Sequence, residues 1–163
     1  MMRSWSEVQA MAERSALGAG VPFAQAARFG AAAARHLSEN RKPDMIAEAL
    51  NAPESITALS LEVERAVEAA SSRGQPYLIA LNPRELAASF LQALPCDAVF
   101  EPVKDGLKAM VLLSDPQRRP RQARLDVPDM LWQQMEALAA QTYVPESEAS
   151  RAQGAGAGLM ELD

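Results

Sequence analysis

The chain has 163 residues and a net charge of −5, and 48% of its residues are hydrophobic. That length is typical of one domain, which can form a core without a disulfide or a metal. The negative charge argues against general binding to nucleic acid, and the sequence lacks the run of about eighteen apolar residues that a membrane span requires. Because Cys96 is the only cysteine and the N-terminus lacks the pattern of a secretory signal, we expect a cytoplasmic protein.

The first half of the chain has the residue spacing of helices. Ser4 followed by Glu7 is the capping-box spacing that begins a helix. Small residues around Gly30 allow a second helix to approach the first closely, which predicts an antiparallel helical hairpin. The expected helices in this half cover residues 4–18, 22–37, 44–50 and 53–70.

The second half alternates between strand and helix patterns. Expected strands cover residues 77–81, 98–103, 107–113 and 123–127, and expected helices cover 84–94 and 128–141. The run 77–81 is continuously apolar, which predicts a central strand buried on both faces. Asp105-Gly106 predicts a tight hairpin, and Pro102 places its own strand at an edge or at a bulge. The order of the strands stays open, including a parallel crossover from the first strand to the second.

Together these patterns predict an α+β fold, with a helical N-terminal half followed by a small three- or four-stranded mixed sheet and flanking helices. We expect a single domain over residues 1–150, made of a helical part at 1–74 and a sheet-containing part at 75–150. Residues 151–163 form a Gly/Ala-rich C-terminal tail, in which glycine disfavours ordering.

Two segments resemble a known family. They are the opening that runs through Gly18-Ala19-Gly20 into an alanine-rich helix, and the ending from Thr142 to Gly158, which reads TYVPESEASRAQGAGAG. Both resemble an uncharacterised proteobacterial family of unknown function. The resemblance implies a small bacterial protein with no assigned activity and no catalytic residues to carry over. It also implies a docked ending, whereas composition predicts a mobile tail, and both alternatives stay open.

The sharpest charge feature is a cluster of four arginines, Arg118, Arg119, Arg121 and Arg124. Guanidinium groups bind phosphate and carboxylate groups in forked pairs, so these residues are the candidate anion-binding site. No aromatic residue interleaves with them, which argues against single-stranded nucleic acid. A solvated loop and contact with a partner's acidic surface remain as alternatives.

The other chemically capable residues have structural interpretations. His36 is the only histidine, so it and Cys96 lack the two further ligands of a zinc site, and we expect no metal and no cofactor. His36 is interpreted as a surface residue at a helix C-terminus, and Cys96 as a small packing residue. The carboxylates are interpreted as helix-start residues rather than an acid–base pair or a magnesium site. They are Asp126, Asp129, Glu146 and Glu148.

These observations assign no catalytic residue and leave it open whether the chain is an enzyme. The favoured hypothesis is a non-catalytic accessory or protein-interaction protein that forms a homodimer. The alternative is a small enzyme or binding protein for an anionic metabolite, held by Arg118–Arg124, with His36 or a carboxylate as the base. A nucleic-acid-associated regulator is the third class, motivated by the arginines alone.

Overall fold

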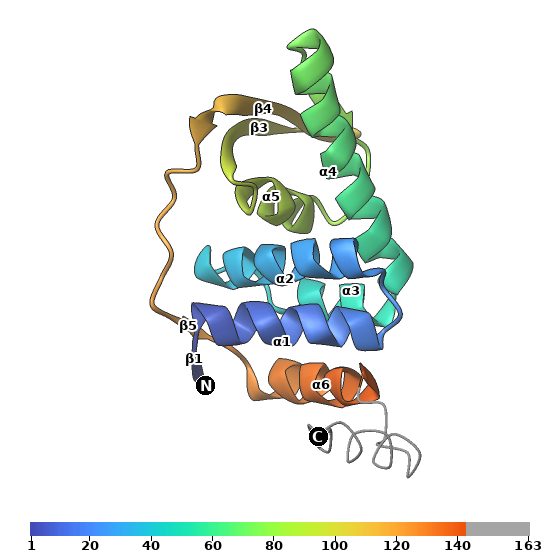
Figure 1. The fold of residues 1–163 in the computed structure, drawn as a ribbon, viewed down its shortest axis with the longest axis vertical. Coiled ribbons are helices and arrows are strands. Elements are labelled where there is room, and N and C mark those ends of the chain that lie inside the picture. Colours follow the sequence, from blue (N-terminus) through green and yellow to red (C-terminus); the bar gives the residue numbers. More distant parts are fainter. Residues whose placement is uncertain (143–163) are drawn as a thin grey trace, which may run out of the picture.

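The computed structural model describes residues 1–142, and the α+β class is confirmed. Figure 1 shows the elements in chain order. The helices are α1 (Trp5–Gly18), α2 (Phe23–Ser38), α3 (Asp44–Asn51), α4 (Pro53–Arg73), α5 (Arg84–Gln92) and α6 (Asp129–Ala139), followed by the 3₁₀ turn Ala140–Thr142. The strands are β1 (Met2–Ser4), β2 (Tyr77–Ile79), β3 (Cys96–Val103), β4 (Gly106–Pro116) and β5 (Arg124–Asp126).

The helices α6, α1, α2 and α5 stack one above the other towards the sheet, and the long helix α4 runs alongside them (Figure 1). The predicted antiparallel pair of α1 and α2 is confirmed. A Cβ atom added at Gly30 would lie 2.6 Å from the backbone oxygen of Gln9, so only glycine permits this separation of the two helices. The first helix begins as predicted, because the Glu7 amide donates to Ser4 Oγ at 3.2 Å and the Ser4 amide donates to Glu7 Oε2 at 2.8 Å.

The main sheet has three strands in the order β2-β4-β3, and both of its strand pairs are antiparallel rather than mixed. The hairpin at Asp105-Gly106 is confirmed, since β3 and β4 pair from Val103↔Gly106 onward. The prediction that residues 77–81 form a central strand is wrong. Here β2 is a three-residue edge strand and β4 is central, because a short apolar run does not distinguish an edge from a centre.

The predicted fourth strand forms, but it does not join the main sheet. Instead β5 pairs with β1, a strand that the sequence pattern did not predict, in the register Arg3↔Leu125. Residues 117–123, called the strap from here on, separate β4 from β5. The strap runs down one side of the molecule from the sheet to the first helices (Figure 1). Pairing of β1 with β5 therefore anchors the far end of the strap beside α1.

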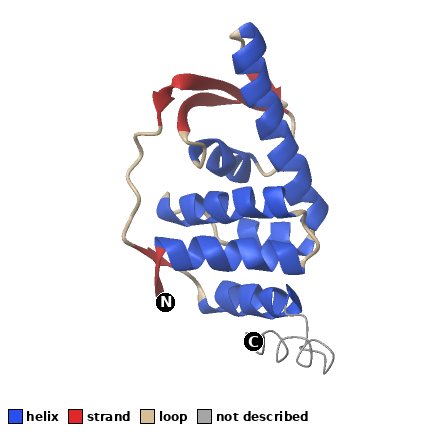
Figure 2. Ribbon diagram, in the orientation of Figure 1, coloured by secondary structure: helices blue, strands red, loops and turns tan. Residues whose placement is uncertain are grey.

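One continuous cluster of buried residues joins the helical part to the sheet, with members such as Phe29, Leu91 and Leu107. On β4, Leu107 and Val111 are each 2% exposed and face α4 and α5, which cover one side of the sheet (Figure 2). Within residues 1–142, no helix combines the length and apolar character needed to cross a membrane. The predicted tail at residues 151–163 lies outside the described residues.

Candidate functional site: an arginine-lined cavity

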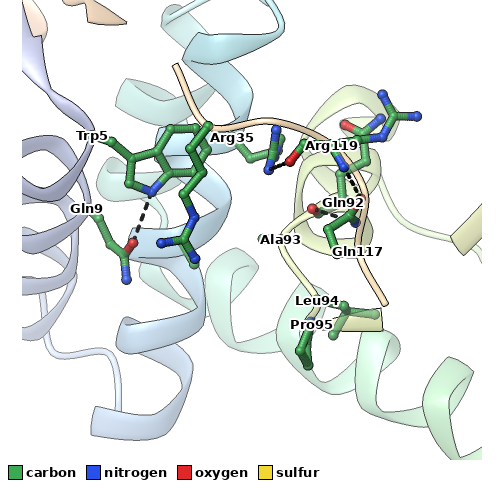
Figure 3. Close-up of a pocket in the computed structure, with 11 residues that line it drawn as sticks. Trp5, Gln9, Arg35, Gln92, Ala93, Leu94, Pro95, Gln117 and Arg119 are labelled. Carbon is green, nitrogen blue, oxygen red and sulfur yellow. Dashed lines mark hydrogen bonds between the residues drawn. The ribbon is translucent and has the colours of Figure 1, made fainter. Parts of the chain in front are cut away.

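A cavity of about 340 Å³ lies between α1, α2, the end of α5 and the strap (Figure 3). Its polar walls are three arginines and three glutamines, Arg35, Arg119, Arg121, Gln9, Gln92 and Gln117. Its apolar walls are Trp5, Ala31, Ala93, Leu94 and Pro95. The volume falls within the range of small-molecule sites, about 300–1,000 Å³. Four segments distant in sequence thus enclose one hollow with cationic and amide groups.

Arg35 on α2 is the most buried of the three arginines, with 4% of its surface exposed. Its Nη1 donates to the Pro120 oxygen at 3.0 Å and its Nη2 to the Arg119 oxygen at 3.4 Å, both on the strap. Its Nε is buried without a hydrogen-bond partner among the described residues. Burial lowers the pKa of Arg35, the Glu39 carboxylate opposes this shift, and the neighbouring guanidiniums add to it, but an arginine stays protonated in proteins. A buried positive charge therefore remains at the cavity wall.

Two of these guanidiniums lie over the indole ring of Trp5. The Cζ of Arg35 lies 4.9 Å and that of Arg121 lies 5.7 Å from the ring centroid, within the range of cation–π attraction. The indole Nε1 donates to Gln9 Oε1 at 3.2 Å, which fixes the ring orientation (Figure 3). The side chain at the start of α1 thus positions cations that come from α2 and from the strap.

One carboxylate, that of Glu39, faces two of the cavity arginines. Its Oε1 lies 3.5 Å from Arg119 Nη1 and 3.8 Å from Arg35 Nη1. Glu39 is not itself part of the cavity wall. Three guanidiniums against one carboxylate leave a net positive charge at the site, although the protein as a whole is acidic.

Hydrogen bonds to backbone carbonyls hold the strap over the cavity. The Gln117 amide donates to the Pro95 oxygen at 2.9 Å, and Gln117 Nε2 donates to the Gln92 oxygen at 3.1 Å. At the other end of the strap, Gln122 Nε2 donates to the Ser38 oxygen at 2.8 Å. The Oε1 of Gln92 is buried without a partner among the described residues. Buried polar atoms normally find partners, so Gln92 and Arg35, two residues of the cavity wall, each have one buried polar atom whose bonding is incomplete.

The structure separates the four arginines of the predicted anion site. Arg119 and Arg121 line the cavity, whereas Arg118 and Arg124 do not. Anion binding by the cluster stays a prediction, and the geometry favours Arg119 and Arg121 for it. Sequence reasoning missed Arg35, although one signal was present: this arginine directly follows a run of four alanines, Ala31 to Ala34.

The interpretation of His36 as a surface residue is wrong, because its side chain is fully buried between α2 and α5. Its Nδ1 lies 2.9 Å from Ser89 Oγ and its Nε2 lies 2.9 Å from the Lys42 oxygen. Arg41 Nη1 also donates to Ser89 Oγ, at 2.7 Å. Burial lowers the pKa of His36, which favours a neutral ring that donates from Nε2 to the Lys42 oxygen, while the Ser89 hydroxyl donates to the Glu85 oxygen at 2.9 Å. His36 is thus a core hydrogen-bonding residue and does not line the cavity.

The remaining candidates lie apart from the cavity. Asp126 and Asp129 both contact the Met1 amino group, at 3.3 and 3.4 Å, and Asp129 is in the first turn of α6 as predicted. Cys96 is half-buried at the start of β3. Glu146 and Glu148 lie outside the described residues. Across residues 1–142, no group of three or more histidine, cysteine and acidic side chains is arranged to hold a metal ion.

Comparison with known proteins adds no identification: no family model matches the chain, and no curated protein or solved structure shows significant similarity to it. The resemblance to an uncharacterised proteobacterial family, most specific over residues 142–158, therefore stays a prediction. What the fold and the site define is an α+β protein with a positively charged cavity beneath a strap.

Proposed function

We propose that this protein binds a small anionic metabolite in the arginine-lined cavity, as an accessory or carrier protein in the cytoplasm. The observation that carries the proposal is that Arg35, Arg119 and Arg121 come from two distant segments and meet around one hollow of metabolite size. Guanidinium groups recognise carboxylate and phosphate groups through charge-assisted hydrogen bonds. Two arginines of the sequence cluster, Arg119 and Arg121, thus line a cavity that could enclose such a group.

The wall chemistry favours binding over turnover. Among the described residues, the cavity is lined by guanidinium, amide and apolar side chains. Guanidinium and amide groups do not accept protons at neutral pH, and general-base catalysis requires a group that does. His36 lies inside the core instead, and the carboxylate of Glu39 is paired with Arg119 and Arg35 and does not line the cavity. A carrier or sensor role therefore suits this set of residues better than catalysis.

Calorimetric titration with inorganic phosphate, acetate and succinate tests the proposal. We expect binding of at least one of these anions, weakened by added salt because the attraction is electrostatic. Arg119→Gln and Arg121→Gln are each expected to weaken it by about tenfold, the loss of one charge-assisted hydrogen bond. Arg118→Gln is the matched control, because Arg118 belongs to the same strap but does not line the cavity. Absence of binding for every anion, or an equal effect of all three substitutions, would refute the proposal.

A second candidate function is self-association through the sheet. The face of the sheet opposite α4 and α5 exposes 63% of Val99 and 45% of Leu78, and Met110 pairs with Val99 on this face. Lys108 and Glu101 pair across the same face, with 3.9 Å between Nζ and Oε1. A face with both charges beside apolar residues is complementary to itself, which a twofold dimer requires.

Sedimentation equilibrium tests the second candidate. We expect a dimer for the native chain and a monomer for Val99→Glu, which places an unpaired charge on the apolar part of the face. Met130→Glu serves as the control, because Met130 is also an exposed apolar residue, with 80% of its surface exposed, but it lies on α6 and not on the sheet. A native monomer at all concentrations would remove this candidate and leave the proposal for the cavity unaffected.

A further inference from the structure

The arginine-lined cavity adjoins a second hollow at the turn between α5 and β3. This second hollow, called the apolar groove from here on, has a volume of about 470 Å³. Its walls are Val67 of α4, the turn Leu94-Pro95-Cys96, and residues 113–116 of β4. Leu94 and Pro95 line both hollows. The turn Leu94-Pro95 thus borders the cavity as well as the apolar groove.

A break in the strand register creates the apolar groove. Cys96 pairs with Pro116, whereas the next residue, Asp97, pairs with Leu112, so residues 113–115 have no partner on β3. Such bulges redirect side chains and occur often beside functional sites. Leu113 is consequently 46% exposed, while Val111 on the same strand is 2% exposed. The bulge leaves apolar surface open to solvent at the place where it meets the cavity.

The two hollows have different chemistry. The cavity has three guanidiniums, whereas the described residues that line the groove include no lysine or arginine. The groove does include one carboxylate, that of Asp115, and the hydroxyl of Ser114. Asp115 repels an anion from the groove, and the arginines attract it to the cavity. A ligand that spans both hollows is therefore oriented with its charge in the cavity and its apolar part in the groove.

We propose that the ligand is an amphiphilic anion: a carboxylate or phosphate head bound by Arg119 and Arg121, joined to an alkyl or aryl chain that lies in the apolar groove. This proposal rests on the proposed function, because it requires the anion site. It goes further by assigning a tail to the ligand and a second binding surface to the protein.

The chain-length dependence of binding tests the proposal in the native protein. Affinity is measured by calorimetry for acetate, butyrate, hexanoate and octanoate, below the concentrations at which they aggregate. We expect binding to tighten by roughly fourfold per added methylene, the ratio that follows from moving one methylene out of water. Octyl phosphate replaces octanoate in a parallel titration, and binding stronger than that of inorganic phosphate supports the same assignment. Binding of 1-octanol as strong as that of octanoate would overturn the requirement for an anionic head.

A matched pair of variants locates the tail. Leu113→Asp is expected to abolish the gain from acetate to octanoate while leaving acetate binding within about twofold. Leu78→Asp is the control, because Leu78 is exposed to 45% against 46% for Leu113 and does not line the groove. Leu113→Ser replaces Leu113→Asp if circular dichroism shows that the aspartate variant is unfolded. Equal effects of the Leu113 and Leu78 substitutions would overturn the assignment of the groove.

The outcomes distinguish failure of this inference from failure of the proposed function. Equal affinity for acetate and octanoate would overturn the inference alone, because the anion site would still bind its head group. Absence of binding for every anion, short or long, would overturn both.

Discussion

Replacement of His36 by glutamine is expected to change how the stability of the protein depends on pH. Burial lowers the pKa of His36 below its ordinary value of 6.5, and the nearby Arg41 charge acts in the same direction, while the hydrogen bond to the Lys42 oxygen opposes both. Above pH 6.5 the ring is neutral in the folded and the unfolded chain, so the stability is at its full value. As the pH falls below 6.5, the unfolded chain binds a proton that the folded chain does not, and unfolding becomes easier.

The size of the effect follows from one titrating group. Each pH unit between 6.5 and the lower pKa of the folded state removes up to about 1.4 kcal/mol from the free energy of unfolding. Since the sequence contains a single histidine, no other imidazole titrates in this range. Protonation would place a second positive charge in the core, beside the guanidinium of Arg41, which already donates to Ser89 Oγ at 2.7 Å. Burial and this neighbouring charge favour the neutral ring.

Urea unfolding followed by circular dichroism at pH 7.5, 6.5 and 5.5 measures the effect. The native protein is expected to lose up to about 1.4 kcal/mol between pH 7.5 and 5.5, and His36→Gln is expected to lose much less, because glutamine does not titrate. A native free energy of unfolding that stays constant over this range, or an equal loss in the variant, would show that protonation of the buried His36 ring does not cause the pH dependence of stability.

Three substitutions test the fold by urea unfolding at pH 7.5. Gly30→Ala places a Cβ 2.6 Å from the Gln9 oxygen and is expected to destabilise the α1–α2 pair by about 1–3 kcal/mol, so an unchanged midpoint would contradict the close approach. Ser4→Ala removes one half of the capping box and is expected to cost about 1 kcal/mol, while an effect near zero would mean that the cap is not needed. Leu125→Ala truncates a β5 side chain that is 1% exposed, with an expected loss of about 2–5 kcal/mol. A loss below 1 kcal/mol there would indicate that β5 is loosely attached.

Local patterns in the sequence were sufficient for most of the secondary structure. The capping box at Ser4, the small residues near Gly30 and the Asp105-Gly106 turn act through neighbours in the chain or through simple steric limits, so their signals are readable without the fold. The strand order was not readable in this way. The apolar run 77–81 is compatible with a central or an edge strand, and the pairing of β1 with β5 joins residues at least 120 positions apart.

For the candidate site too, some residues could be predicted from the sequence and others only from the tertiary structure. The sequence by itself placed Arg119 and Arg121 in one charged segment, because charge and spacing are local properties. Only the tertiary structure decided that Arg35 meets them, since α2 and the strap approach each other through contacts between distant residues. Burial of His36 and the groove beside Leu113 were decided in the same way, by how α5 packs and by how β3 and β4 pair. A side chain's environment is set by the elements that pack against it, which its own sequence neighbours do not specify.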